Sequence, residues 1–228
     1  MEAGEMKERP ILFSAPMVRA ILAGTKTQTR RAVKPQPEVS EQGNLCGAWL
    51  SRPLGGLLLP KVGDIAMHCP YGKPGDRLWV REAFRFLNSF DADSPAAIGV
   101  KCISAGYPKP WAPIQYKADG NRDNWLAVCT PPADMPTPGK LRPGIHMPRW
   151  ASRILLEVTA VRVERLHDIS QADCIAEGAT GGHGSIAGYP YAATPDEHYR
   201  RIWEQINGAG AWDVNPWVWV IEFRSVQS

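Results

Sequence analysis

The longest regular pattern in the chain is RILLEVTAVRVERL, which occupies residues 153–166 and alternates with the two-residue period of a β-strand. Its apolar residues keep to one face as far as Val158 and change phase before Val161. A change of phase is typical of a β-bulge, where one strand holds an extra residue. The pattern therefore predicts a long strand with a bulge or bend near Ala160.

Capping residues and apolar periodicity predict three helices. One follows Ser14, and a second follows the S-x-x-D capping box at Ser170 and ends at Gly178. A third starts at Thr194 and places apolar residues at positions i, i+3, i+4 and i+7. Shorter strands are predicted at residues 11–13, 78–80, 114–118 and 216–226.

Two stretches, residues 32–73 and 85–147, are rich in glycine and proline and have no sustained period. Long irregular spans inside a compact domain are typical of functional loops or of partly mobile segments. The other segments, with helices beside five or six strands, predict an α+β fold built on a small barrel or curled sheet. We expect a single domain over residues 1–228, with the two stretches as insertions.

Overall charge says little about partners. The formal charge of +3 and the pI near 8.6 are too weak to imply nucleic acid by themselves. The N-terminal sequence MEAGEMKERP is charged, and no run approaches the ~18 apolar residues of a membrane helix. We therefore expect a cytoplasmic protein that does not bind a membrane.

The cysteines at positions 46, 69, 102, 129 and 174 are widely spaced, so the chain has no CxxC pair. Such a scattered set favours reduced thiols. His68 and Cys69 could form half of a zinc site, but no second close pair completes it. We expect neither a metal ion nor another cofactor.

The segment GTKTQTRR, residues 24–31, gathers hydroxyl and cationic side chains directly after a helix end and contains no acidic residue. It has the form G-x-K-x-x-T-x-R, and G-D-x-L-W-V at residues 75–80, Glu177-Gly178 and V-W-V-I-E-F at residues 218–223 accompany it. With these motifs the chain resembles the ASCH-domain family of the PUA-like superfamily, and especially its long members from bacteriophages and prophages.

The resemblance implies a PUA-like β-barrel with flanking helices and a cleft that accepts a modified nucleoside or an RNA segment. Members similar to small bacterial amidohydrolases remove the acetyl group from N4-acetylcytidine. By motif, their catalytic residues correspond here to Lys26, Thr29 and Glu177. Other members are RNA-binding modules or ribonucleases, so these alternatives remain open. Residues 119–147 are expected to be a lid over the cleft if the insertion covers it.

Elementary chemistry gives the same residues plausible roles. Thr29 can attack an amide only if a base takes its proton, and Lys26 can be that base if burial or a cationic neighbour lowers its pKa. On a straight strand, however, positions 26 and 29 would point to opposite faces. Glu177, in the last turn of a helix, is expected to have a raised pKa and to act as an acid. A solvated hairpin and a surface glutamate are the non-functional alternatives.

Five further residues are candidates for substrate binding. Arg30 and Arg31 could lower the pKa of Lys26, or bind an oxyanion or a phosphate. Glu82 could reach the cleft, although an ion pair with an arginine is the alternative that we favour. Arg149 and Trp150 together have the form of a phosphate contact beside a base-stacking ring.

Overall fold

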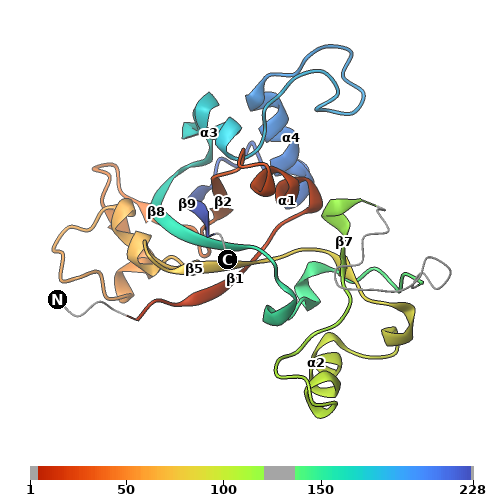
Figure 1. Cartoon of the computed structure of the whole chain (residues 1–228). Coiled ribbons are helices and arrows are strands. Elements are labelled where there is room, and N and C mark those ends of the chain that lie inside the picture. Colours follow the sequence, from red (N-terminus) through yellow and green to blue (C-terminus); the bar gives the residue numbers. More distant parts are fainter. Residues whose placement is uncertain (1–4, 121–136, 227–228) are drawn as a thin grey trace.

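A five-stranded sheet forms the centre of the molecule (Figure 1). The computed structural model describes residues 5–120 and 137–226. The strands lie in the order β1-β5-β8-β9-β2, where β1 and β5 are parallel and the other neighbours are antiparallel. Their bounds are β1 (Glu8–Leu12), β2 (Gln28–Ala32), β5 (Arg77–Arg81), β8 (Leu155–Arg165) and β9 (Trp217–Val226).

The long predicted strand is β8, and its bulge is confirmed. The pairing between β8 and β9 shifts register between Val158 and Ala160. Beyond the shift, Val161 and Val163 pack against the same apolar core that buries Val158. The extra residue therefore returns the apolar side chains to the core, which explains the change of phase in the sequence.

The helices are α1 (Ala15–Leu22), α2 (Pro95–Ser104), α3 (Gln171–Ala176) and α4 (Pro195–Asn207). The capping box predicted at Ser170 is formed, and Thr194, where the third helix was predicted to start, forms a capping box as well. Helix α2 was not predicted, although Ser94 caps it and Pro95 occupies its first turn. Figure 1 places α3 and α4 together at one side of the sheet and α2 on an arm at the opposite side.

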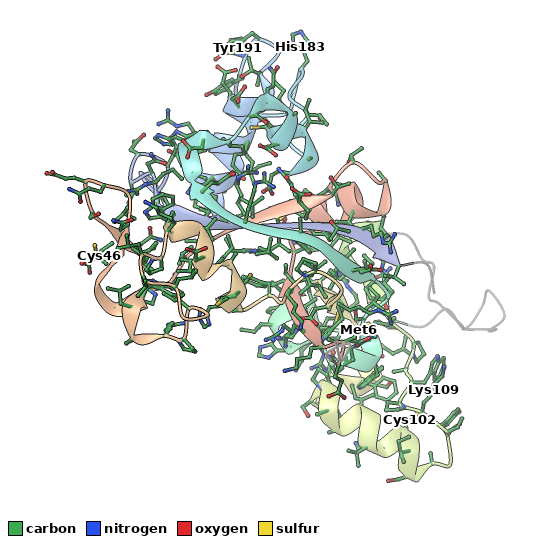
Figure 2. All side chains as sticks on the ribbon, turned by 90° about the vertical axis from the view of Figure 1, so that its left-hand side faces the viewer. Met6, Cys46, Cys102, Lys109, His183 and Tyr191 are labelled. Carbon is green, nitrogen blue, oxygen red and sulfur yellow. The ribbon has the colours of Figure 1, made fainter. Side chains whose placement is uncertain are left out.

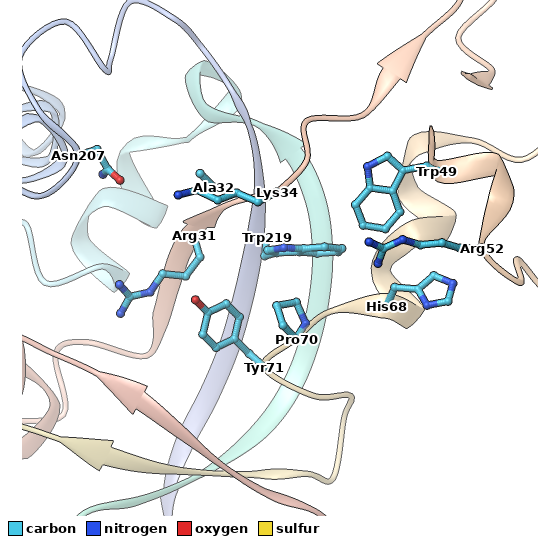
Figure 3. Close-up of a pocket in the computed structure, with 10 residues that line it drawn as sticks. All are labelled: Arg31, Ala32, Lys34, Trp49, Arg52, His68, Pro70, Tyr71, Asn207 and Trp219. Carbon is cyan, nitrogen blue, oxygen red and sulfur yellow. The ribbon is translucent and has the colours of Figure 1, made fainter. Parts of the chain in front are cut away.

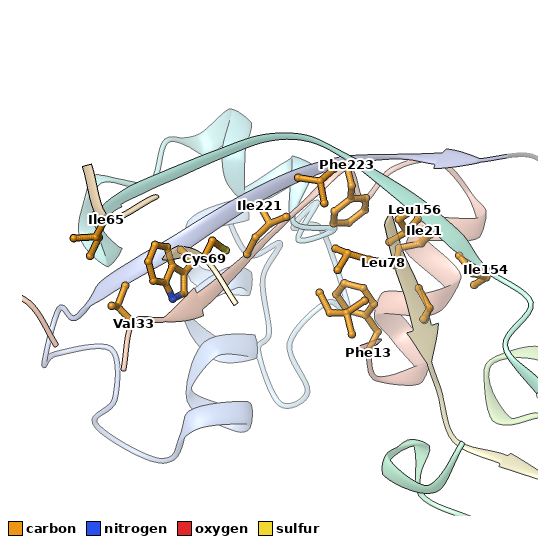
Figure 4. Packing of buried hydrophobic residues seen from close by; sticks show 14 of the residues in the cluster. Phe13, Ile21, Val33, Ile65, Cys69, Leu78, Ile154, Leu156, Ile221 and Phe223 are labelled. Carbon is orange, nitrogen blue, oxygen red and sulfur yellow. The ribbon is translucent and has the colours of Figure 1, made fainter. Parts of the chain in front are cut away.

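The first insertion folds onto the central core, although its sequence predicts mostly loop. It contains the short strands β3 (Glu38–Val39) and β4 (Leu45–Cys46) and the 3₁₀ helices η1 (Gly47–Ser51) and η2 (Val62–His68). Val33, Ile65 and Cys69 are buried beside Ile221 of β9 (Figure 4). The first insertion is therefore a structured wall beside the sheet.

The second insertion packs around a separate apolar core, in which Phe86 and Ile98 join Phe84, the residue that directly precedes the insertion. Strands β6 (Phe84–Arg85) and β7 (Gln115–Tyr116) pair within it, so the strand predicted at residues 114–118 is only two residues long. Residues 121–136 of the expected lid lie outside the described residues. The remaining 3₁₀ helices of the described residues are η3 (Asn88–Phe90), η4 (Lys117–Asp119), η6 (Gly144–His146), η7 (Arg149–Ala151) and η8 (Leu166–Asp168).

The α+β class is confirmed, whereas closure of the sheet into a barrel stays a prediction. Strands β1 and β2 end the sheet and do not pair with each other in the described ranges. A side chain links them instead, because Arg31 Nη2 donates a hydrogen bond to the carbonyl oxygen of Leu12 at 2.6 Å. None of the helices in residues 5–120 and 137–226 has the length and apolar character needed to cross a bilayer.

Candidate functional site

A tight turn after α1 brings Lys26 to the sheet. Gly24 takes a φ of 74°, and the backbone amides of Thr25 and Lys26 both donate to the carbonyl oxygen of Ala20. Lys26 then forms an isolated antiparallel bridge with Glu177 before β2 begins at Gln28. Because Lys26 precedes the strand, the alternation of a straight strand does not decide how its side chain lies relative to that of Thr29.

The end of α3 supplies the other half of this contact. Glu177 is the C-cap residue of α3, and Gly178 follows it with a φ of 90°. A Cβ atom on Gly178 would lie 3.1 Å from the Cβ of Ala20 and 3.5 Å from that of Lys26. Glycine is therefore needed here both for its backbone angle and for the close approach of the two segments.

Lys26 and Glu177 form a buried ion pair. Lys26 Nζ lies 2.7 Å from Glu177 Oε2, and the exposed fractions of the two side chains are 0% and 3%. Nζ also donates to the carbonyl oxygens of Gln28 at 2.8 Å and Glu177 at 2.9 Å. All three protons of the ammonium group are thereby used. The solvated-hairpin and surface-glutamate alternatives are excluded for this pair.

The surroundings of Lys26 lower its pKa. Burial is the main cause, since it penalises the charged form, and the positive charges of Arg31 and Arg30 add to it. The negative charge and hydrogen bond of Glu177 oppose the shift without cancelling it. The two conditions that chemistry set for a basic lysine, burial and cationic neighbours, are therefore both met.

Arg30 holds Glu177 in place. Its guanidinium, with an exposed fraction of 0%, contacts Glu177 Oε1 at 3.4 Å, Glu164 Oε1 at 2.5 Å and Asp173 Oδ2 at 3.2 Å. Burial alone would lower the pKa of Arg30, but the charge of Glu177 and the hydrogen bond to Glu164 raise it. Arg30 is thus a cation that contacts three carboxylates, one of which is that of Glu177.

Thr29 lies on β2 and lines a small cavity of about 40 Å³, here called the inner cavity. Glu177, Arg30, Arg31 and the α4 residue Tyr199 line it too. Within the part of the chain that the structure describes, the Thr29 hydroxyl makes no hydrogen bond. The structure therefore brings Thr29 and Glu177 to one cavity, but Thr29 is not hydrogen-bonded to Lys26 in this conformation.

Arg31 is the cation best placed to meet a substrate. It is half-buried, lines the inner cavity, and lies over the Phe13 ring at 5.4 Å. Its Nε atom is buried without a hydrogen-bond partner among the described residues. Unlike Arg30, it makes no ion pair with a carboxylate in the ranges that the structure covers, so its positive charge is not neutralised.

The other three predicted binding residues lie elsewhere and line neither the inner cavity nor its larger neighbour. Glu82 is buried and pairs with Arg153 at 2.9 Å, which is the arginine pairing that we favoured. Arg149 is exposed and pairs with Glu8 at 2.8 Å. Trp150 stacks on Phe86 at 5.8 Å in the core of the second insertion.

Several site residues were not identified as such from the sequence. Tyr199 was expected only as an apolar position of α4, yet it lines the inner cavity, and burial together with the charge of Glu177 raises its pKa well above the usual value. Glu164 lies on β8 and contacts Arg30 across 134 positions of sequence. Asp173, the carboxylate of the capping box, also contacts Arg30. The capping-box pattern in the sequence identifies Asp173, but no local pattern predicts its contact with Arg30.

Metal-binding groups and known relatives give no further assignment. No cluster of three or more His, Cys, Asp or Glu side chains in the described ranges is arranged to hold a metal ion. His68 instead contacts the carbonyl oxygen of Pro53 at 2.8 Å, and burial raises the pKa of Cys69 to about 11. Comparisons of the chain with protein-family models, curated proteins and solved structures found no match.

Proposed function

We propose that the protein is an amidohydrolase of the ASCH type, on a PUA-like barrel, that removes an acyl group from the exocyclic amine of a modified cytidine. The observation that carries the proposal is the buried pair of Lys26 and Glu177 at 2.7 Å, next to a cavity that Thr29 lines. A buried ion pair is a poor device for stability alone, because its desolvation cost offsets its attraction. Its chemistry, however, suits a site that moves protons.

The first step requires a neutral Lys26. Transfer of one proton from Lys26 Nζ to Glu177 Oε2, over the 2.7 Å contact, leaves a neutral amine and a protonated carboxyl group. The amine takes the proton of the Thr29 hydroxyl as its oxygen attacks the acyl carbon. Arg31, whose charge is not neutralised, is the donor best placed to stabilise the oxyanion.

The second step releases the nucleoside. The carbon–nitrogen bond breaks as Glu177 gives its proton to the leaving amine, and the acyl group remains as an ester on Thr29. A water molecule, deprotonated by the Lys26–Glu177 pair, then hydrolyses the ester and restores the Thr29 hydroxyl. The net reaction converts the amide and one water into a cytidine and a carboxylic acid.

A non-catalytic RNA-binding module is the second candidate. It is favoured by the volume of the inner cavity, about 40 Å³, which is far below the about 300–1,000 Å³ of ligand sites. A nucleoside therefore enters only if α4 or the side chains of the cavity move. A module that binds RNA without such a movement predicts affinity that falls steeply as salt rises, and no product.

Chromatography of reaction mixtures separates the two candidates. The protein is incubated at high concentration with N4-acetylcytidine and with cytidines that carry longer acyl groups. The amidohydrolase proposal predicts cytidine and the free acid in equal amounts. A labelled RNA incubated in parallel tests the ribonuclease alternative, which predicts that the RNA shortens.

A further inference from the structure

A second, larger cavity of about 360 Å³ lies beside the inner cavity and is here called the basic cavity (Figure 3). The first insertion builds one wall of it with residues of η1, η2 and the segments that follow them. Strands β2 and β9 supply the other wall through Arg31 and Trp219. Its volume is in the range of ligand sites, about 300–1,000 Å³.

The cavity carries positive charge that no acidic side chain neutralises. Arg31, Lys34 and Arg52 line it, whereas no aspartate or glutamate does. Among the described residues, none of these three cations forms an ion pair with a carboxylate; Arg31 is half-buried, and Lys34 and Arg52 are exposed. Figure 3 shows the guanidinium group of Arg52 pointing toward Trp219, whereas that of Arg31 lies on the other side of Trp219 and points away from it. A cavity lined by arginine and lysine without carboxylates favours an anion with several oxygens, because guanidinium groups match phosphate geometry.

Aromatic rings make up much of the rest of the lining. The Arg52 guanidinium lies 4.2 Å from the centre of the Trp49 ring, a cation–π contact at the edge of the cavity. Trp219 has an exposed fraction of only 2% and forms the floor, while the Tyr71 and His68 rings are half-buried and reachable. Cations interleaved with flat groups are typical of sites for nucleotides.

The two cavities are neighbours. Arg31, Ala32 and Asn207 line both of them, so a ligand in the basic cavity lies beside one in the inner cavity. Arg31 comes from the strand that carries Thr29, which fixes the offset between the two positions. A nucleotide whose base faces Thr29 can therefore place its phosphate among the cations of the basic cavity.

We propose that the basic cavity is a phosphate-binding subsite built by the first insertion, so that the substrate is a nucleotide, either free or within an RNA strand, and not an unphosphorylated nucleoside. The inference rests on the proposed function for the identity of the base. The phosphate recognition rests only on the cations and rings of the basic cavity.

Isothermal titration calorimetry with three unreactive probes tests the inference: cytidine, cytidine 5′-monophosphate and a five-nucleotide cytidine RNA. The protein should bind the monophosphate at least about tenfold more tightly than cytidine, with the difference shrinking as salt rises. Arg52→Gln and Lys34→Gln should each remove most of that difference. Lys109→Gln is the matched control, since Lys109 is an exposed cation on the arm of α2, opposite Cys46 and the first insertion (Figure 2).

The RNA arm identifies the source of the phosphate. If the protein binds the RNA more tightly than the monophosphate, the bound phosphate belongs to an RNA strand. If it binds both equally, the bound phosphate belongs to a free nucleotide. Equal affinity for cytidine and its monophosphate, unchanged binding in Arg52→Gln, or no binding of any probe would overturn the inference. Because no probe carries an acyl group, a protein that binds the monophosphate but releases no product would keep this inference and lose the proposed function. A protein that deacylates the acylated nucleoside and its monophosphate equally well would keep the proposed function and lose this inference.

Discussion

Lys26 Nζ and Glu177 Oε2 are joined at 2.7 Å, although 151 positions of sequence separate the two residues and solvent reaches neither side chain appreciably. The contact links the turn after α1 to the last turn of α3, two segments that lie far apart in the sequence. It also places a lysine of lowered pKa beside a cavity that a threonine lines. The proposed chemistry depends on this relationship.

Removing one partner of the pair is expected to destabilise the protein. Lys26→Met leaves the Glu177 carboxylate buried beside Arg30 alone, and Glu177→Gln leaves a buried ammonium without its carboxylate. Each single variant should lower the free energy of unfolding by about 3–5 kcal/mol, and the double variant by less than the sum. Urea unfolding of the four proteins measures the coupling. Strictly additive losses would show that the pair does not act as a unit.

Thr29 is expected to matter for turnover much more than for folding. Thr29→Val keeps the shape of the side chain and suits β2, but it removes the nucleophile. It should cut turnover by about a hundredfold or more, while Thr29→Ser retains part of it. Thr27→Val is the control, because Thr27 is exposed and does not line the inner cavity. A larger loss of turnover in Thr27→Val than in Thr29→Val would show that Thr27, and not Thr29, is the nucleophile.

The pH dependence of kcat/KM should report on Lys26. The proposed mechanism needs the proton that passes from Lys26 to Glu177 and then to the leaving amine, so kcat/KM should fall as the pH increases through the pKa of Lys26 and the pair loses that proton. Burial lowers the pKa of Lys26, so the fall should lie below the ~10.4 of an ordinary lysine. Lys26→Arg should abolish the activity. The same fall in the residual activity of this variant would come from another group.

Gly178 is expected to be intolerant of a side chain. Gly178→Ala has to adopt a φ of 90° and bring its Cβ to 3.1 Å from that of Ala20, so it should separate α3 from Lys26. Gly188→Ala is a matched control, because its φ is 84° but a Cβ there would meet no atom within 4 Å. Both variants should lose about 1–2 kcal/mol of stability from the backbone angle. Only Gly178→Ala should lose more stability and turnover as well.

The thiol of Cys174 provides a probe of α3 in these variants. Burial, followed by the charge of Asp196, raises the pKa of Cys174 to about 12, so the thiolate that reacts with alkylating reagents is scarce. In the folded protein Cys174 should react with iodoacetamide far more slowly than the half-buried Cys46. Fast labelling of Cys174 in a site variant, located by mass spectrometry, would show that α3 has detached.

Local signals predicted the elements that depend on neighbouring residues. The bulge near Ala160 and the capping box at Ser170 were both read from the sequence, because alternation and capping involve only a few adjacent positions. Helix α2 was not predicted, although its cap at Ser94 is an equally local feature. The helix is short, and the prolines around it indicated an irregular segment. The strand β2, which carries Thr29, was missed because its sequence QTRRA is polar and its partner β9 is far along the chain.

Contacts between distant segments could not be predicted in this way. No local pattern shows that Lys26 and Glu177 are paired and buried, so the stability loss expected of their variants follows from the structure alone. Arg30 stays a predicted substrate contact, but no local pattern indicated its partner Glu164 on β8. Trp150 stays a predicted stacking residue, but its contact with Phe86 was not foreseen. In each case the decisive fact is which residues of another element lie beside the side chain.

The most direct test of the account is the rate at which the protein forms cytidine from N4-acetylcytidine. Chromatography measures this rate with the enzyme in excess over the substrate. The same measurement on Thr29→Val and Glu177→Gln, each first shown to be folded by slow Cys174 labelling, assigns the site. We expect rapid conversion by the unmodified protein and a loss of about a hundredfold or more in each variant. No cytidine from the unmodified protein, or equal rates in all three proteins, would contradict the assignment of Lys26, Thr29 and Glu177 as a hydrolytic site.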